Sequence, residues 1–390
     1  MNLIDREGRP SSCCSRSTER QIGALLLSFA GAVRIRPREA NDEEESATNR
    51  RMSIQPIGRE LQSWNWKGML KLWSLLVFVV EEITLPLGLQ LLRVLDIEDA
   101  PIEVLPEELV DLFNLRYLNL KGTRVKELPK SIGRLCNLNT LDITNSKIEV
   151  LPAGITELQN LRHLMMYHFD YRRLDDFHFG RGTTTPSNIC KLKNLQVLAG
   201  VEAQADLMKR IRNMTQLKRI GITKWPRLTE DPIPYIQALP NLGRLFLCNA
   251  YEGGQLRFSE GFRKLRTLNL WKFPQLNEII IERGVMPGLQ QFYTGECMQL
   301  KILPHGIEYL EDLQELHLMC VTNELIECIC GEGSKDHQKC CGCGVADGFL
   351  LSNSCSSEFS ELYICCVGYL LSNSCSLEFS GLYGGASLLS

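Results

Sequence analysis

Leucine returns at a fixed step of 23 residues in the first half of this chain, at Leu92, Leu115, Leu138 and Leu161. Proline keeps the same step at Pro106, Pro129 and Pro152. Further leucines continue the series at steps of 22 to 25 residues, at Leu195, Leu217, Leu242, Leu265, Leu289 and Leu313. A repeat of this kind indicates one short structural unit used many times, because each unit buries its second apolar side only against a neighbour.

Aligned on Leu115, the unit reads N-L-x-x-L-x-L-x-x-T-x-L-x-x-L-P-x-x-I-G-x-L. Alternate residues of a strand point to opposite faces, so Leu118 and Leu120 are expected to face a core. Proline cannot donate a ladder hydrogen bond, so the turn that follows the strand should end at Pro129. Ile132 and Leu135 should then fill the core from the opposite side.

A period of about 20 to 29 residues with this leucine spacing is that of the leucine-rich repeat, whereas helical repeats are longer. We therefore predict an α/β leucine-rich-repeat solenoid, with a curved parallel sheet on the concave side and an irregular or helical convex side. Disordered N- and C-terminal tails should flank it. Ten units at about 4.8 Å per strand give a wall of roughly 45 Å, which suits a protein surface better than a small molecule.

The predicted organisation has four parts. Residues 1–49 are a disordered segment, 50–90 a connector and the N-terminal edge of the solenoid, 91–328 the repeat domain, and 329–390 a low-complexity tail rich in Cys and Ser. Residues 165–193 lengthen one unit to 34 residues, which predicts a loop on one face. In the next unit, Gly200 falls where the earlier units have a core leucine.

Composition limits the classes of partner and the compartment. The chain has 43 Lys and Arg against 46 Asp and Glu, so no nucleic-acid partner is predicted. Its apolar runs are shorter than the ~20 residues that a membrane helix needs, so no membrane span is predicted. Cysteines without a pattern in the repeats indicate a cytoplasmic protein with thiols in its core, at Cys136, Cys190, Cys248, Cys297 and Cys320.

The concave face is the predicted protein-binding surface, because aromatic residues and arginine at outward strand positions are typical of interface hot spots. Its predicted members are Tyr117, Asn119, Lys121, His163, Tyr167, Arg244, Phe246, Trp271, Tyr293 and His317. We expect these side chains to be exposed. On that basis, Trp271→Ala and Tyr293→Ala should weaken partner binding without lowering the melting temperature.

Metal and catalytic sites are not predicted. Two groups have enough candidate ligands: Cys328, Cys330, His337, Cys340, Cys341 and Cys343, and then His168, Asp170, Asp175, Asp176 and His178. In the first group the pairs Cys328/Cys330 and Cys341/Cys343 are C-x-C, whereas structural zinc sites usually use C-x₂₋₄-C with hydrophobic framing, and the second group is typical of a charged loop in solvent. No H-E-x-x-H, G-x-S-x-G or paired nucleophile and base occurs, so we expect neither a cofactor nor an enzyme.

The repeats, together with RRMSIQ at residues 50–55 and LWSLLVF at 72–78, resemble plant intracellular disease-resistance proteins of the coiled-coil, nucleotide-binding, leucine-rich-repeat family. The resemblance covers residues 50–328. It implies repeats that sense pathogen effectors, or host proteins altered by them, and that restrain a nucleotide-binding switch. The phosphate loop G-x-x-x-x-G-K-[ST] is missing, because no Gly-Lys dipeptide occurs. A switch domain would therefore act in trans, and the chain is expected to be truncated relative to full receptors.

Three functions remain open at this stage. The first is a protein-recognition module in plant innate immunity. The second is an intracellular leucine-rich-repeat scaffold similar to those that bind small GTPases, although such scaffolds tend to keep a 23-residue step throughout. The third, an extracellular receptor ectodomain, is disfavoured because secreted plant repeats typically read GxIP where these read LP.

Overall fold

The computed structural model of the protein describes residues 71–77, 89–168, 182–223, 228–318, 322 and 324–325, and the backbone of 33–35, 51–54, 319 and 349–352. The chain divides into two units, and all described residues belong to the one that comprises residues 32–353. Residues 1–31 and 354–390 make up the other unit, outside the described ranges. Among the described helices, none combines the length and hydropathy that crossing a membrane requires.

A parallel sheet of fourteen described strands runs through the unit, and each strand pairs with the next along it. The strands, in spatial order, are β1 (Val33–Ile35), β2 (Arg51–Ile54), β3 (Ser74–Val77), β4 (Val94–Asp96), β5 (Tyr117–Asn119), β6 (Thr140–Asp142), β7 (His163–Met165), β8 (Val197–Glu202), β9 (Arg219–Thr223), β10 (Arg244–Cys248), β12 (Thr267–Trp271), β14 (Gln291–Gly295), β15 (Glu315–Met319) and β16 (Phe349–Ser352). All ten repeat-opening leucines are followed by a strand that begins two residues later, so the predicted repeat register is confirmed.

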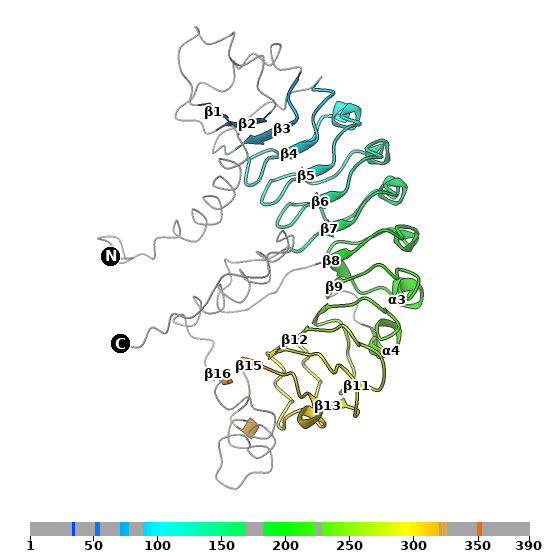
Figure 1. Ribbon diagram of the computed structural model, residues 1–390, viewed down its shortest axis with the longest axis vertical. Coiled ribbons are helices and arrows are strands. Elements are labelled where there is room, and N and C mark those ends of the chain that lie inside the picture. Colours follow the sequence, from blue (N-terminus) through cyan, green and yellow to red (C-terminus); the bar gives the residue numbers. More distant parts are fainter. Residues whose placement is uncertain are drawn as a thin grey trace, which may run out of the picture. The chain divides into compact units, whose positions relative to one another are not determined.

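Short helical segments lie on the other side of the repeats: η3 (Glu107–Asp111), η4 (Ile132–Arg134), η5 (Ala153–Glu157), η6 (Ile189–Lys191), α3 (Ala205–Ile211), α4 (Ile233–Ile236) and η7 (Ile307–Tyr309). Figure 1 shows strands β4 to β9 side by side on the inner side of an arc, with the helical segments on its outer side. Pro106 and Pro152 precede η3 and η5 in an extended conformation, where the missing N–H costs nothing. The predicted leucine-rich-repeat solenoid is confirmed.

The core lies between the strands and the helical segments, as one apolar cluster from Leu72 to Leu325. Leu118 and Leu120 from the strand side and Ile132 and Leu135 from the helical side are all fully buried. Burying a leucine side chain contributes about 1.5–3 kcal/mol relative to exposing it. Repetition of the leucine positions therefore extends one core along the whole array.

Asparagine side chains join successive repeats at the turn before the strands. Each side-chain amide donates to the carbonyl oxygen of the preceding repeat, at 2.8–2.9 Å in the five pairs Asn114–Gln90, Asn137–Phe113, Asn160–Cys136, Asn194–Gln159 and Asn241–Thr215. The bond from Asn194 to Gln159 connects the repeats on either side of the long unit. The asparagine of the repeat unit therefore helps to maintain the stacking across the insertion.

The assignment of Gly200 to a core position was wrong. Gly200 is the extra residue of a β-bulge, with φ +84°, and the pairing of β8 with β9 shifts there. Val201, the next residue, pairs with Ile222 and is fully buried in the core instead. Counting from Leu195 places the core position one residue too early, at Gly200 instead of Val201, because a bulge adds a residue to one strand.

Three further features differ from the prediction. Strand β1 lies within residues 1–49, and β16 lies within residues 329–390, although both segments were expected to be disordered. On the helical side, β11 (Gln255–Phe258) and β13 (Glu278–Ile281) form a second parallel sheet. Their side chains alternate between buried and more exposed positions, which is a strand pattern that the repeat alignment assigned to irregular structure.

Residues 169–181 of the predicted loop lie outside the described residues.

Candidate functional site

The predicted surface residues occupy three rows on the face of the sheet opposite the core, which we call the strand face. Tyr117, His163 and Arg244 share the row that runs along the first residues of the strands. The middle row contains Asn119, Phe246, Tyr293 and His317. Trp271 lies at the end of β12, and Lys121 and Tyr167 follow β5 and β7. The sheet thus places on one face residues that are up to 200 positions apart in the chain, from Tyr117 on β5 to His317 on β15.

The expectation that all ten side chains are exposed was wrong. Trp271 is 2% exposed, and Asn119, Tyr167, Phe246 and Tyr293 are at most 8% exposed. The other five are partly exposed: Tyr117, Lys121, His163, Arg244 and His317. The four buried aromatic residues lie outside the main apolar cluster. Trp271→Ala is now expected to lower the stability of the fold, because it removes buried aromatic area.

Glycines on nearby strands explain why two aromatic rings on this face are buried. A Cβ atom on Gly221 of β9 would overlap the hydroxyl of Tyr167, and one on Gly295 of β14 would overlap the ring of Trp271. The ring of Tyr167 also meets that of Phe246 edge-on, with ring centroids 5.7 Å apart. The rings therefore lie over glycine backbone, and burial raises the pKa of Tyr167 to about 12.

A hydrogen-bonded group occupies the end of the strand face formed by β14 and β15. The carboxylate of Glu315 accepts hydrogen bonds from Gln291 at 3.1 Å and from the Tyr293 hydroxyl at 2.9 Å, and its Oε2 lies 3.2 Å from His317 Nε2. The rings of Tyr293 and His317 stack at a centroid distance of 4.5 Å. Tyr293 and His317 thus have fixed orientations, which favours a preformed contact surface.

Two aspartates lie at the other end, where Asp96 of β4 is partly buried and Asp142 of β6 is buried. Asp96 and Asp142 each accept a hydrogen bond from the backbone N–H two residues later, which turns the chain at the strand end. Asn119 lies between them and donates to Asp96 at 3.0 Å. Burial raises the pKa of Asp96 to about 7, with a smaller effect from Glu98, and burial also raises the pKa of Asp142. We call Asp96, Glu98 and Asp142 the acidic patch.

Sequence reasoning missed a line of basic side chains beside the strand face, although it included Arg244. Five repeats carry Arg or Lys directly after the opening leucine, at Arg93, Arg116, Arg162, Lys218 and Arg266. These five residues and the nearby Arg219 and Arg244 are defined here as the basic edge. This line could have been found in the sequence, because the residue after the opening leucine can be aligned in every unit and is Arg or Lys in five of them.

Among the described residues, no group of three or more His, Cys, Asp or Glu side chains is arranged to hold a metal ion. His168 uses both ring nitrogens in the fold, with Nδ1 3.1 Å from the Ser146 carbonyl oxygen and Nε2 2.9 Å from the Thr183 hydroxyl. Burial lowers the pKa of His168, which favours the neutral ring. Its four companions in the sequence, and the six Cys and His residues from Cys328 to Cys343, lie outside the described ranges.

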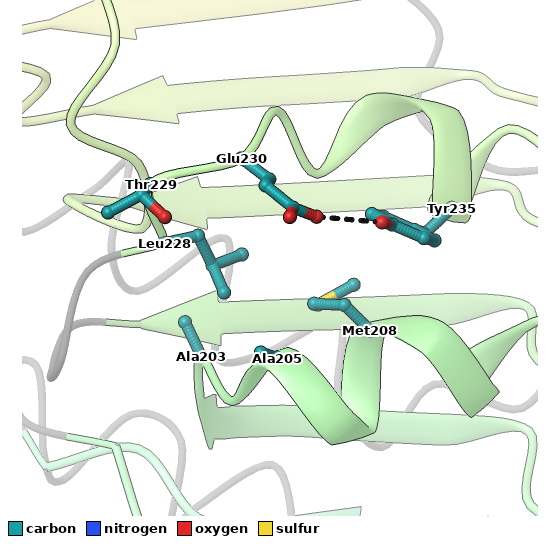
Figure 2. Close-up of a pocket in the computed structure, with 7 residues that line it drawn as sticks. All are labelled: Ala203, Ala205, Met208, Leu228, Thr229, Glu230 and Tyr235. Atoms are coloured by element: carbon teal, nitrogen blue, oxygen red, sulfur yellow. Dashed lines mark hydrogen bonds between the residues drawn. The ribbon is translucent and has the colours of Figure 1, made fainter.

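A small cavity of about 150 Å³ lies on the helical side, between α3 and α4. Figure 2 shows Ala203, Ala205, Met208 and Leu228 among the residues that line it, and the carboxylate of Glu230 accepting a hydrogen bond from Tyr235, at 2.9 Å. Sites for drug-sized ligands usually measure ~300–1,000 Å³. This cavity is therefore too small to be a site of that type.

Comparisons with known proteins agree with this geometry. Residues 71–231 match the family model described as a leucine-rich repeat region. Disease resistance protein RPM1 of Arabidopsis thaliana is 40% identical, over 65% of this chain and 35% of that protein. Disease resistance protein RPP8 of the same plant is 32% identical, over 29% of this chain and 12% of that protein. The chain thus carries a leucine-rich-repeat region that is similar to the repeat regions of plant disease resistance proteins.

This leucine-rich-repeat region spans only a minor part of the relatives that it matches, 35% of the first and 12% of the second. Among solved structures, the Arabidopsis receptor kinase HAESA, in complex with the peptide hormone IDA and the co-receptor SERK1, has a TM-score of 0.45 and 17% sequence identity. That match covers 70% of this chain and 47% of HAESA.

Proposed function

We propose that this chain recognises proteins in plant defence against pathogens and that it does so in the cytoplasm. The observation that carries the proposal is a strand face of in-register repeats in a region 40% identical to a plant disease resistance protein. A broad parallel sheet whose outward residues are free to vary is suited to binding another macromolecule. Proteins are therefore the proposed class of partner.

The proposed partner is a pathogen effector or a host protein that an effector alters. A nucleotide-binding switch domain in trans is a further proposed partner, as the resemblance to the resistance family implies. The scaffold function is less well supported, because the repeat steps vary between 22 and 25 residues after Leu195 and one unit has 34. On the strand face, the partly exposed residues Tyr117, Lys121, His163, Arg244 and His317 are the proposed contacts.

The test is genetic complementation in the plant that encodes the chain. Lines without the gene are infected with a panel of pathogen isolates, and pathogen growth is measured. Isolates that grow better on these lines are then tested after return of the wild-type gene, or of a Tyr117→Ser, His163→Ser, Arg244→Ser variant. The matched control carries Glu108→Ser, Lys191→Ser and Arg212→Ser, three exposed positions on the helical side.

We expect at least one isolate to grow better without the gene. The wild-type gene and the helical-side variant should restore resistance, and the strand-face variant should not. If no isolate in the panel distinguishes the lines, or if the strand-face variant restores resistance as well as the control does, the proposed function is wrong.

A further inference from the structure

The backbone places the basic edge on one continuous line. The residue after each repeat-opening leucine offers its carbonyl oxygen to two N–H groups of the next repeat: Arg93 accepts from Arg116 and Tyr117 at 2.8 and 3.0 Å. The same pair of bonds recurs in every repeat as far as Gln290. Successive members of this line are Arg93, Arg116, Asn139, Arg162, Gln196, Lys218, Gly243, Arg266, Gln290 and Gln314. Five are basic and none is acidic.

Five side chains of the basic edge are exposed, and one of them, Arg266, donates a hydrogen bond to the Gly288 carbonyl at 3.1 Å. Arg93, Arg116, Arg162, Lys218 and Arg266 are exposed, and the guanidinium of Arg93 lies 4.6 Å from the Trp73 ring centroid. Within the described part of the chain, no carboxylate forms an ion pair with Arg116, Arg162, Lys218 or Arg244. Their charges are therefore available to a binding partner.

The charges also act together on a neighbouring group. His163 begins β7, in the row next to the line, and its pKa is lowered by burial and then by the positive charges of Arg162 and Lys218. Arg162 precedes β7 and Lys218 precedes β9, two strands farther along the sheet. The positive potential therefore extends across strands, as expected for a row of like charges.

The rest of the strand face limits the width of what can bind. The acidic patch lies on the same face, near the opposite ends of the strands, with Asp142 buried and Glu98 paired to Lys121 at 3.0 Å. A wide polyanion such as duplex nucleic acid or an anionic membrane would cover both the basic edge and these carboxylates. A single extended segment, one strand wide, can follow the basic edge alone.

We propose that the basic edge binds an extended acidic segment of a partner protein. This inference rests on the proposed function, because it names the chemistry of a partner for the same strand face. From β4 to β12 the basic edge crosses eight strands, or roughly 34 Å at about 4.8 Å per strand. An extended chain rises about 3.3 Å per residue, so the segment has about ten residues. The segment would lie across the strands, along the line of basic residues.

The experiment measures binding of a fluorescein-labelled decaglutamate probe to the full chain by fluorescence anisotropy at low and high salt. The edge variant carries Arg116→Glu, Arg162→Glu and Lys218→Glu. A control variant carries Lys130→Glu, Lys191→Glu and Arg212→Glu, three exposed basic residues on the helical side, and so has the same net charge. Decaglutamine and a short DNA duplex serve as comparison probes, and circular dichroism melts check that both variants fold.

Decaglutamate should bind the wild type and the control variant with similar affinity, and bind the edge variant at least tenfold more weakly, since three attractive contacts become repulsive. Added salt should weaken binding, because exposed charges are screened. Decaglutamine should not bind. Equal loss in both variants, no binding to the wild type at low salt, or tighter binding of the duplex than of decaglutamate would overturn the inference.

The two proposals fail in different ways. If decaglutamate does not bind but plants lacking the gene still lose resistance to an isolate, only the partner chemistry is wrong. If decaglutamate binds the basic edge but no isolate distinguishes the lines, the edge holds an acidic segment for a purpose other than defence. Should the edge variant fail to fold, the single substitution Arg162→Gln provides the comparison: a weakening of about twofold to fivefold is expected, and unchanged affinity would overturn the inference.

Discussion

At the scale of single residues, the burial of aromatic rings on the strand face depends on glycines that lie beside them. Tyr167 and Trp271 were predicted from alternation alone, and alternation placed them on the correct face. Their burial could not be predicted, because it requires Gly221, on the second strand after β7, and Gly295, on the strand that pairs with β12, and both glycines are far from the rings in sequence. Leu118 and Leu120 were predictable as core residues, since their burial follows from the period of the repeat itself.

Gly221→Ala should destabilise the protein through Tyr167. The added Cβ would overlap the tyrosine hydroxyl and force a buried ring to move, at a cost of about 1–3 kcal/mol. The same substitution should cost much less in a Tyr167→Ala background, where the ring is absent. Urea denaturation of the two single variants and the double variant measures this coupling. Equal costs in both backgrounds would show that the two residues do not interact.

Asp96 should make stability depend on pH. Its pKa is raised to about 7 by burial and then by Glu98, against about 3.9 for an aspartate in an unfolded chain. The folded state therefore binds more protons between these values, and the stability from the neutral carboxyl is full below about pH 4 and is lost as the pH rises to 7. The loss amounts to at most about 1.4 kcal/mol for each pH unit.

Asp96→Asn should remove this dependence, because the amide does not ionise. The free energy of unfolding of the variant, relative to that of the wild type, should therefore increase from pH 5 to pH 8. Chemical denaturation at several pH values measures the difference between the two proteins. Asp312→Asn, at an exposed position, is the control and should leave the pH profile unchanged. A wild-type profile parallel to that of Asp96→Asn would contradict the assignment.

At the scale of elements, the strands follow from the leucine positions, whereas the bulge in β8 and the second sheet formed by β11 and β13 do not. A repeat alignment assumes a constant number of residues per unit, so an added residue moves every later assignment in that unit by one. Unit lengths after residue 161 vary between 22 and 34, and this is where the prediction failed. The basic edge was predictable, because its members follow the best conserved feature of the repeat unit, the opening leucine.

Gly200→Ala should be much more damaging than Gly284→Ala. Both glycines have positive φ, +84° and +81°, so alanine is strained at either position. A Cβ on Gly200 would also lie 2.6–2.8 Å from backbone atoms of Met166 and Tyr167, whereas a Cβ on Gly284 meets nothing within 4 Å. We expect a cost of about 1–2 kcal/mol for Gly284→Ala and clearly more for Gly200→Ala. Thermal melts of both variants check the order, and equal melting temperatures would refute the role of the bulge.

At the scale of the whole repeat array, the proposed function depends on a sheet that continues through all the repeats. Arg93 and Arg116 lie before the long unit, and Lys218 and Arg266 lie after it, so they form one edge only if the sheet continues between β7 and β8. Two observations support continuity: the Met166 N–H donates to the Ala199 carbonyl at 2.8 Å, and the Asn194 side chain donates to the Gln159 carbonyl at 2.9 Å. Arrays of this kind gain their cooperativity from such contacts between neighbours.

Amide hydrogen exchange at residue resolution on the full chain tests this continuity most directly. The account predicts that the amide of Met166, which joins β7 to β8, is protected as strongly as those of Ile143 and Asn249, which join strands within either half. All three should open in one cooperative step as denaturant is added. Rapid exchange at Met166, with separate openings before and after residues 169–181, would contradict the account, because the strand face and its basic edge would then be two surfaces.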